Sequence, residues 1–561
     1  MGKLFRKTNL IFCILLLLVN CKNNNKVISR SDIDSINLKR GAIVQCGPAD
    51  QQFGSVNFET SCPQIIKKDF NLAMALLHSF EYDEAEKMFA KIIDAEPGCA
   101  MAYWGVAMSN FHPLWAPATP AELVKGSKAI ALARSLGRSS ERESDYIEAI
   151  AKYFQDGDRL DHHTRCIRYE SAMEIIYKKY PDDKEASIFY ALALDAAADP
   201  ADTSFAKQIK AGKILNAVYP GEPNHPGIIH YIIHTYDYPG LAELALPAAR
   251  RYASVAPASA HAEHMPSHIF TRLGLWDESI RSNLASAASA KCYAENSAIK
   301  GHWDEELHAM DYLMYAYLQK ADDSLAKAEW DYLKTIKVVY PLDFKVAYAY
   351  AAIPCRYVLE NKMWKDAAQL ETYPADFPWN KFPWQHAMIH FTRALGDAHI
   401  GRIDSARNEL HILNTLHDML ANEKDMYKTM EVAIQIKAAE AWILFQEGSR
   451  DKALTLMLAA ADMEDATQKH PVTPGELIPA RELLGDMLFQ MGKTDKAFNA
   501  YQYDLKIHPN RFNGLLGAGL AAEKSGNKKQ AAYYYRLLSA VSSTQSNRSD
   551  LVTARYFLKK N

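Results

Sequence analysis

The chain has 561 residues, a formal net charge of −3 and a hydrophobic fraction of 48%. This length is too great for one compact core, and it fits either several domains or one repetitive array. Lysine and arginine are scattered along the chain, so no basic face predicts nucleic acid as a partner.

The first twenty residues are typical of a bacterial secretion signal. Three basic residues precede an apolar run at 10–19, which is too short to span a bilayer. The sequence LVNC at 18–21 resembles a bacterial lipobox, although Asn20 is larger than the residue usual before the cysteine. We therefore expect residues 1–20 to be removed and Cys21 to anchor the chain by lipid in the cell envelope, on the periplasmic or outer-membrane side. An uncleaved anchor or an ordinary signal peptide is the alternative.

Residues 21–63 read as a polar tether followed by an extended segment that contains cysteines. In an oxidising compartment disulfides persist, and Cys46, Cys62 and Cys99 are candidates for one. A Cys62–Cys99 bridge would tie off the first helix pair, and Cys46–Cys62 is its rival. The remaining cysteines of the mature chain lie in helical surroundings and are expected to be buried thiols: Cys166, Cys292 and Cys355.

Helix pairs are predicted from residue 64 onward. The segment 70–97 (FNLAMALLHSFEYDEAEKMFAKIIDAEP) has small residues where two helices would cross, at Ala73 and Ala85. Phe89 follows in the second helix and Pro97 ends it. One such hairpin cannot bury its apolar face alone, so neighbouring hairpins must stack on each other.

The clearest repeats lie near the C-terminus, in the segment 481–509 and the one that follows it. A small residue, an alanine and a tyrosine recur after thirty-four residues, at Gly485, Ala497 and Tyr501 and then at Gly519, Ala531 and Tyr535. Thirty-four residues is the period of the tetratricopeptide repeat.

Four further phrases give the chain its resemblance to a known family: LLHSFEYDEAEKMF with CAMAYWGVAMS (76–109), HPGIIHYIIHTYD (225–237), HAEHMPSHIFTRLGLWDESIRSN (261–283) and EDATQKHPVTPGELIPARELLGDML (464–488). The chain resembles secreted bacterial tetratricopeptide repeat (TPR) proteins over nearly all of its mature length. The resemblance implies a repeat scaffold and no established activity.

The predicted fold is therefore an all-α, right-handed solenoid of TPR-like helix hairpins. We divide it into N-terminal hairpins at 64–220, histidine-rich central hairpins at 221–320, C-terminal repeats at 321–545 and a tail at 546–561. The concave groove of such a solenoid is expected to bind a protein, peptide or small ligand.

Histidine is concentrated in the central hairpins, where eight of the nineteen lie between His225 and His308. His230 and His234 are four residues apart in a predicted helix, so both imidazoles would lie on one face, close enough to share a metal. His264 and His268 have the same spacing but lie on either side of Pro266.

These residues predict a metal site as the alternative function. His225, His261 and Asp237 are the further candidate ligands, and this donor set suits zinc, iron or copper. Neither pair has the glutamate of an HExxH motif, which disfavours a zincin-type peptidase, and no catalytic residue is predicted. The competing interpretation is structural, because histidines in helix hairpins often satisfy buried polar groups.

The segment 464–476 interrupts the helical pattern with two prolines and is a second candidate site. Glu464, Asp465 and His470 are its candidate binding residues, since irregular loops on a rigid scaffold often carry function. The alternative is an ordinary connection between two helices.

Overall fold

The computed structural model describes residues 28–47, 52–114, 117–137, 139–199 and 202–560. The predicted signal at 1–20 and Cys21 lie outside these ranges. Regular structure within them is helical except for two parallel two-residue strands, β1 (His302–Trp303) and β2 (Val339–Tyr340).

The helices up to the first strand are α1 (Arg30–Asp34), η1 (Gln64–Ile66), α2 (Lys67–His78), α3 (Tyr82–Ala95), α4 (Ala100–Ser109), α5 (Pro120–Leu136), α6 (Glu141–Phe154), α7 (His162–Lys179), α8 (Lys184–Ala196), α9 (Ala206–Val218), η2 (Tyr219–Gly221), α10 (Pro226–Thr235), α11 (Ala242–Val255), α12 (Ala260–His264), α13 (Pro266–Arg272) and α14 (Trp276–Asn296).

The helices after it are α15 (Asp304–Gln319), α16 (Asp323–Leu333), α17 (Phe344–Glu360), α18 (Trp364–Ala368), η3 (Trp379–Lys381), α19 (Pro383–His399), α20 (Ile403–Asn422), α21 (Met426–Gln446), α22 (Arg450–Asp465), α23 (Ala480–Gln490), α24 (Thr494–Ile507), α25 (Phe512–Lys524), α26 (Lys528–Val541) and α27 (Ser549–Lys560).

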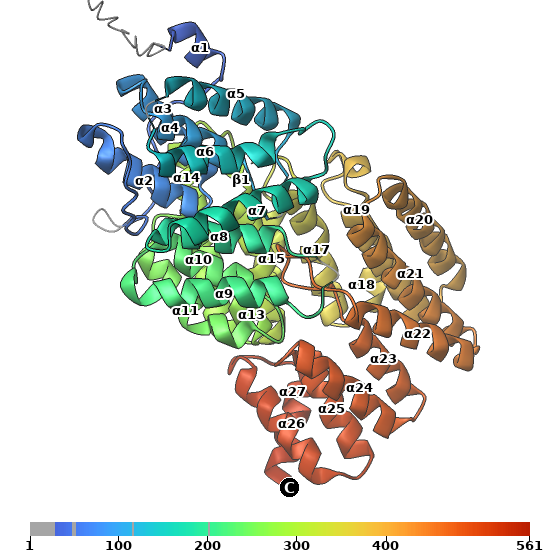
Figure 1. The fold of residues 1–561 in the computed structure, drawn as a ribbon. Helices are drawn as coiled ribbons and strands as arrows, with labels where there is room; N and C mark the ends of the chain where they lie inside the picture. The colour runs from blue at the N-terminus through green and yellow to red at the C-terminus, as the bar shows by residue number, and fades with distance from the viewer. Residues whose placement is uncertain (1–27, 48–51, 115–116, 138, 200–201, 561) are drawn as a thin grey trace, which may run out of the picture.

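Each helix from α2 to α26 packs against the next one in the chain. Alternate helices also touch, for example α2 with α4, α17 with α19 and α23 with α25. In Figure 1 the blue helices lie at one end of the molecule and the red helices at the other, while α14 lies back among the first helices. This arrangement confirms the prediction of an all-α solenoid built from TPR-like hairpins.

Close helix crossings depend on the small residues that the repeat pattern predicted. A methyl group added to Gly485 would lie 2.6 Å from the ring of Tyr501, and one added to Gly519 would lie 2.4 Å from the ring of Tyr535. Since real Cβ contacts are longer than this, a side chain at either glycine would push the paired helix away.

The buried apolar side chains form two large clusters and a small third one of Trp276, Tyr315 and Ala316. One large cluster runs from Ile28 to Phe270 and the other from Leu307 to Phe557. The central helices α12 to α15 therefore lie where the two large clusters meet, and this junction holds the histidine-rich segment.

The N-terminal half coils back on itself, so that α2 contacts α10. Every residue of α4 and of α10 is buried, which means that both inner helices are covered on all sides. The concave groove predicted from the solenoid geometry is therefore filled with side chains in this half of the molecule.

The cysteines are paired across the N-terminal half. Cys62 is joined to Cys99, one of the two alternatives left open by the sequence, and Cys46 is joined to Cys292. The expectation that Cys292 is a thiol is wrong, because its partner lies 246 residues earlier in the chain. Cys166 and Cys355 are free and buried.

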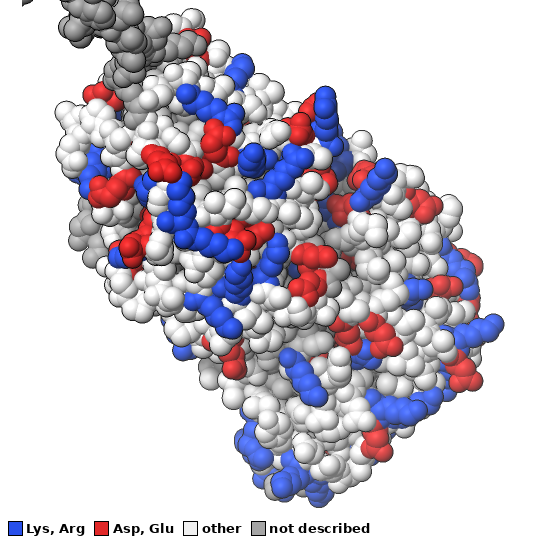
Figure 2. All heavy atoms as spheres, in the orientation of Figure 1, with Lys and Arg blue, Asp and Glu red and all other residues white. Residues whose placement is uncertain are grey.

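The surface is mixed in charge. Acidic and basic side chains are interspersed over the face drawn in Figure 2. Among the described residues, no helix has both the length and the apolar character that crossing a bilayer requires. The segment predicted as a tail contains α27, which packs against α26.

Candidate metal centre

Three histidines from two helices meet in what we call the first histidine set. His230 and His234 lie one turn apart on α10, which Pro226 opens, and their Nε2 atoms are 3.0 Å apart. His261, on α12, places its own Nε2 3.1 Å from that of His230. His230 and His234 are buried, and His261 is partly so.

A second histidine set lies beside the first. His264 is the last residue of α12 and His268 belongs to α13, and their Nε2 atoms are 3.0 Å apart. His308 on α15 completes the set, with its ring centroid 4.2 Å from that of His264. In each set one ligand atom per histidine lies within 4.8 Å of the other two. His308 was not among the predicted ligands, although it lies in the histidine-rich window that the sequence identified.

The Nδ1 atoms of these rings are held by groups that only accept hydrogen bonds. His230 donates from Nδ1 to the carbonyl oxygen of His78 over 2.7 Å. His264 donates to Asn283 Oδ1 over 2.7 Å, and the Asn283 amide is oriented for this by donating to the Ser279 carbonyl. Hydrogen on Nδ1 leaves a lone pair on Nε2, the tautomer that a metal ligand requires.

His268 is oriented in the same way, by a carboxylate. Its Nδ1 donates to Asp237 over 3.0 Å, and Asp237 is held in turn by Arg272 and Lys469 at 2.9 Å each. Asp237 therefore lies behind the ring rather than beside Nε2. The prediction grouped it with the ligands, and the structure places it in the supporting position.

These tautomers leave two lone pairs facing each other across 3.0 Å, on Nε2 of His264 and of His268. Neither atom carries a hydrogen to donate, so the contact is repulsive unless a cation lies between them. A proton is disfavoured there, since burial and the neighbouring His268 hold the pKa of His264 well below its usual value. A tetrahedral zinc ion with bonds of about 2.0–2.1 Å brings two ligand nitrogens to about 3.3 Å, close to the spacing found.

In the first histidine set, too, nitrogen atoms face each other without enough hydrogen-bonding partners, at Nε2 of His230. Its Nε2 faces both His234 and His261, yet it has a single lone pair with which to accept. Burial and then His261 hold the pKa of His230 well below its usual value, which keeps this ring neutral. Three converging neutral imidazoles have the donor atoms of a transition-metal site.

His225, also predicted as a ligand, lies elsewhere. It donates from Nε2 to Glu185 over 3.0 Å, and His78 donates from Nε2 to the other oxygen of the same carboxylate over 3.0 Å. The Tyr231 hydroxyl donates to Nδ1 of His78, so every hydrogen in this group has an acceptor. Nδ1 of His225 is buried and has no hydrogen-bond partner among the described residues, so one acceptor of this group is left over. The backbone carbonyl of His78 links the group to His230.

The connection between α22 and α23 reaches the centre through a residue that the prediction missed. Lys469 is buried and pairs with Asp237, whereas none of the three predicted residues of this segment contacts either histidine set. Ala480 donates its amide to Glu464, Arg481 pairs with Asp465, and His470 packs against Trp384 and Tyr427. The sequence gives no sign of this role, because Lys469 differs from other lysines only in its ion pair with Asp237, which is far away in the chain.

Comparison with known proteins adds a fold-level likeness. No protein-family model matches the chain, and no curated protein sequence does either. The chain is similar to the TPR domain of P58(IPK), at 16% identity over 67% of this chain and 99% of that one, with a TM-score of 0.20. It is also similar to human IFIT1 bound to PPP-AAAA, at 14% identity over 83% and 95%, with a TM-score of 0.34. At these sequence identities and TM-scores the likeness says nothing about function. The fold is assigned from the pairing of consecutive helices in this chain.

Proposed function

We propose that this protein binds transition-metal ions through the two histidine sets. The observation that carries the proposal is the pair of facing lone pairs on His264 and His268, which a bound cation would turn from a repulsive contact into two ligand bonds. All-imidazole donors suit zinc, iron or copper, the metals expected from the sequence. Once bound, such an ion would supply Lewis-acid chemistry, and iron or copper would add electron transfer.

The chain's own residues prepare both sites for the ion. His78, Asn283 and Asp237 hold hydrogens on the Nδ1 atoms of His230, His264 and His268, so these three rings need not turn when a metal arrives. Burial lowers the pKa of the second set's His308, followed by the effect of His264, so protons compete weakly for these nitrogens. Metal affinity is therefore expected to persist into mildly acidic solution.

Metal content decides this proposal. We expect protein purified from cells grown with zinc, iron and copper to retain close to two equivalents of metal by elemental analysis. Replacing both His264→Ala and His268→Ala should remove one equivalent, because the second set would lose two of its three histidines while the first set stays intact. Retention of less than a tenth of an equivalent by the wild type would end the proposal.

A matched control is available on α19, where His386 and His390 have the same four-residue spacing and Nε2 atoms 3.1 Å apart. Only two imidazoles meet there, so the site should bind metal weakly. The double variant His386→Ala with His390→Ala should keep the wild-type metal content after exchange against a chelator.

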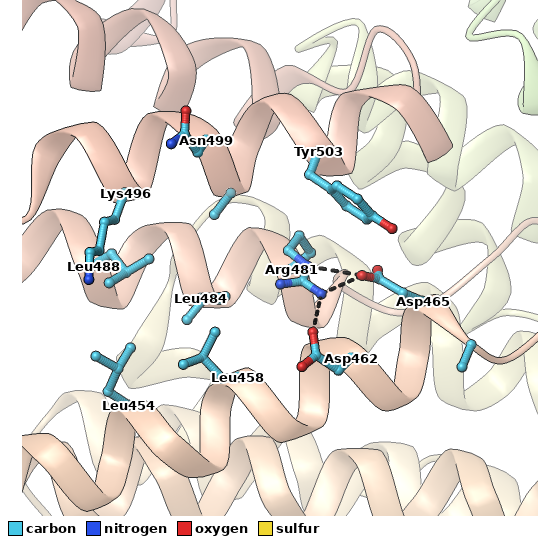
Figure 3. A pocket seen from close by; sticks show the side chains of 12 residues that line it. Leu454, Leu458, Asp462, Asp465, Arg481, Leu484, Leu488, Lys496, Asn499 and Tyr503 are labelled. Carbon is cyan, nitrogen blue, oxygen red and sulfur yellow. Dashed lines mark hydrogen bonds and ion pairs between the residues drawn. The ribbon is translucent and has the colours of Figure 1, made fainter.

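A second function is favoured by the surface of the C-terminal repeats. A cavity of about 710 Å³ lies between α22, α23 and α24, with Leu458 and Leu484 on its wall (Figure 3). Arg481 is held at its edge by Asp462 and Asp465. Leu458 and Tyr503 are 40% and 46% exposed, so the cavity presents apolar surface to a partner.

We propose that this cavity binds a protein or peptide at the cell envelope, to which Cys21 would anchor the chain. The two disulfides support an oxidising compartment. In membranes from the native cells we expect the wild type to be retained and to crosslink to a partner, Leu458→Glu to lose that crosslink, and Cys21→Ser to appear in the soluble fraction. A crosslinking pattern unchanged by Leu458→Glu would exclude the cavity, and retention of Cys21→Ser would exclude the anchor.

A further inference from the structure

The two histidine sets are contiguous. His261 of the first set and His264 of the second are three residues apart on α12, so they are neighbours on one face of that helix. His234 and His268 also meet edge to face, with ring centroids 6.3 Å apart. Two ions held by these sets would therefore lie beside each other with no secondary-structure element between them.

Glu305 on α15 lies near both sets. It lies three residues before His308, which places the two side chains on the same face of the helix. Burial raises the pKa of its carboxyl, and Lys345, then His261 of the first set and His268 of the second, lower it below its usual value, which indicates that the carboxylate lies near both sets. A carboxylate near both sets is a candidate anionic ligand for ions bound there.

One oxygen of Glu305 is already used and the other is not. Oε1 accepts from Lys345 over 2.6 Å. Oε2 is buried, and among the described residues no group hydrogen-bonds to it. Since a buried carboxylate oxygen without a partner is costly, this free acceptor calls for a positive charge beside it.

We propose that the two histidine sets form one dinuclear metal centre, with Glu305 as its carboxylate. This inference rests on the proposed metal binding. It adds that the two ions share a ligand and act as one centre. Six neutral imidazoles do not compensate the positive charge of two divalent ions. The ions of two-metal sites lie only about 3.5–4 Å apart, so they repel each other strongly. An anionic ligand is therefore needed, and the carboxylate of Glu305 between the ions would supply it.

Aromatic contacts shield one side of this centre. Tyr312 stacks on His268 with centroids 5.2 Å apart and meets His264 edge to face at 4.7 Å. Its hydroxyl is directed away from the rings, donating to the Val472 carbonyl over 3.0 Å. Tyr312 therefore does not act as a ligand. The coordination positions that the histidines and Glu305 do not fill are open to a small ligand that binds through oxygen.

Copper loading tests the dinuclear arrangement without any mutation. Apoprotein is titrated with Cu(II), bound copper is counted by elemental analysis, and electron paramagnetic resonance measures the unpaired spins. Two bridged ions couple antiferromagnetically, so we expect two bound coppers to give less than a fifth of the spin signal of two isolated ions. A full signal of two spins would overturn the inference while leaving metal binding intact, whereas failure to bind copper at all would overturn both.

Breaking one set should restore the signal. His308→Ala is expected to bind a single Cu(II) with a signal of one full spin, about five times the signal per copper of the wild type. A variant that still binds two coppers and stays silent would contradict the assignment of His308 to the second ion.

The role of Glu305 has its own matched control in Asp304, which also pairs with Lys345. Glu305→Gln should keep two coppers but recover most of the two-spin signal, because the carboxylate between the ions is lost. Asp304→Asn removes the other half of the Lys345 ion pair and should leave the spectrum as in the wild type. Equal spectra for both variants would mean that Glu305 acts only through Lys345, and that its role as a ligand is wrong.

Discussion

At the scale of single residues, hydrogen-bond acceptors far away in sequence decide what the histidines can do. His230 is oriented by the backbone of His78, 152 residues earlier, and His268 by Asp237, 31 residues earlier. The four-residue spacings predicted which rings share a face. They could not predict which nitrogen carries the hydrogen, because that depends on groups brought in by other helices.

His399 shows what burial alone does to an imidazole in this chain. It lies between Trp364 and Trp442, with centroids 3.8 Å and 4.2 Å away, and its Nε2 is buried without a hydrogen-bond partner among the described residues. Burial lowers its pKa to about 4, and the nearby Asp486 only partly offsets this. The neutral ring is therefore the form that stabilises the fold.

We predict that the contribution of His399 to stability is lost in acid. Since the folded pKa lies below the ordinary value, the unfolded chain takes up the proton first, and stability falls as the pH drops from about 6.5 towards 4. The loss should reach up to about 1.4 kcal/mol per pH unit for this one group. Urea unfolding of the wild type and of His399→Leu at several pH values measures it, and the gap between the two should narrow in acid. A gap independent of pH would contradict the pKa assignment.

At the scale of helices, local spacing was a good guide even where the helix is interrupted. Pro266 separates α12 from α13, yet Met265 keeps helical angles of −53° and −35° and bonds to His261 as a helix would. The backbone therefore continues its turn through the break, and His264 and His268 still meet. His264 is the last residue of α12 and still shares a face with His268.

Repeat residues were equally predictable at this scale. Gly485 and Tyr501, and Gly519 and Tyr535, touch as the thirty-four-residue pattern indicates, because both members of each pair belong to one hairpin. Contacts between distant helices were not predictable in this way. Cys292 on α14 gives no sign in sequence that Cys46 is its partner.

At the scale of the whole molecule, the solenoid is wound tightly enough that its first helices touch its middle ones. His78 of α2 lies against Tyr231 of α10, and Cys46 is bonded to Cys292 of α14. This winding closes the predicted groove in the N-terminal half and creates the buried junction that holds the histidine sets. The candidate metal centre is thus a product of the superhelix, with no single repeat supplying it.

The long-range disulfide should matter most for this winding. Cys46–Cys292 closes a loop of 246 residues and Cys62–Cys99 one of 37. On the chain-entropy estimate, removing them costs up to about 5.5 and about 4 kcal/mol. We expect the double variant Cys46→Ser with Cys292→Ser to melt at a lower temperature than Cys62→Ser with Cys99→Ser, as measured by circular dichroism under oxidising conditions. The reverse order would show that the superhelix does not depend on the long closure.

The sequence by itself determined the helices, their pairing into hairpins and the histidines that share a face, since all of these depend on residues within one or two turns or within one repeat. The tertiary structure alone decided that the two sets are contiguous, that His308 completes the second set, that Asp237 supports His268 from behind and that His225 belongs to a separate group. The physical reason is that these contacts join helices from different turns of the superhelix. Their registry depends on how all the intervening hairpins stack, which no local pattern encodes.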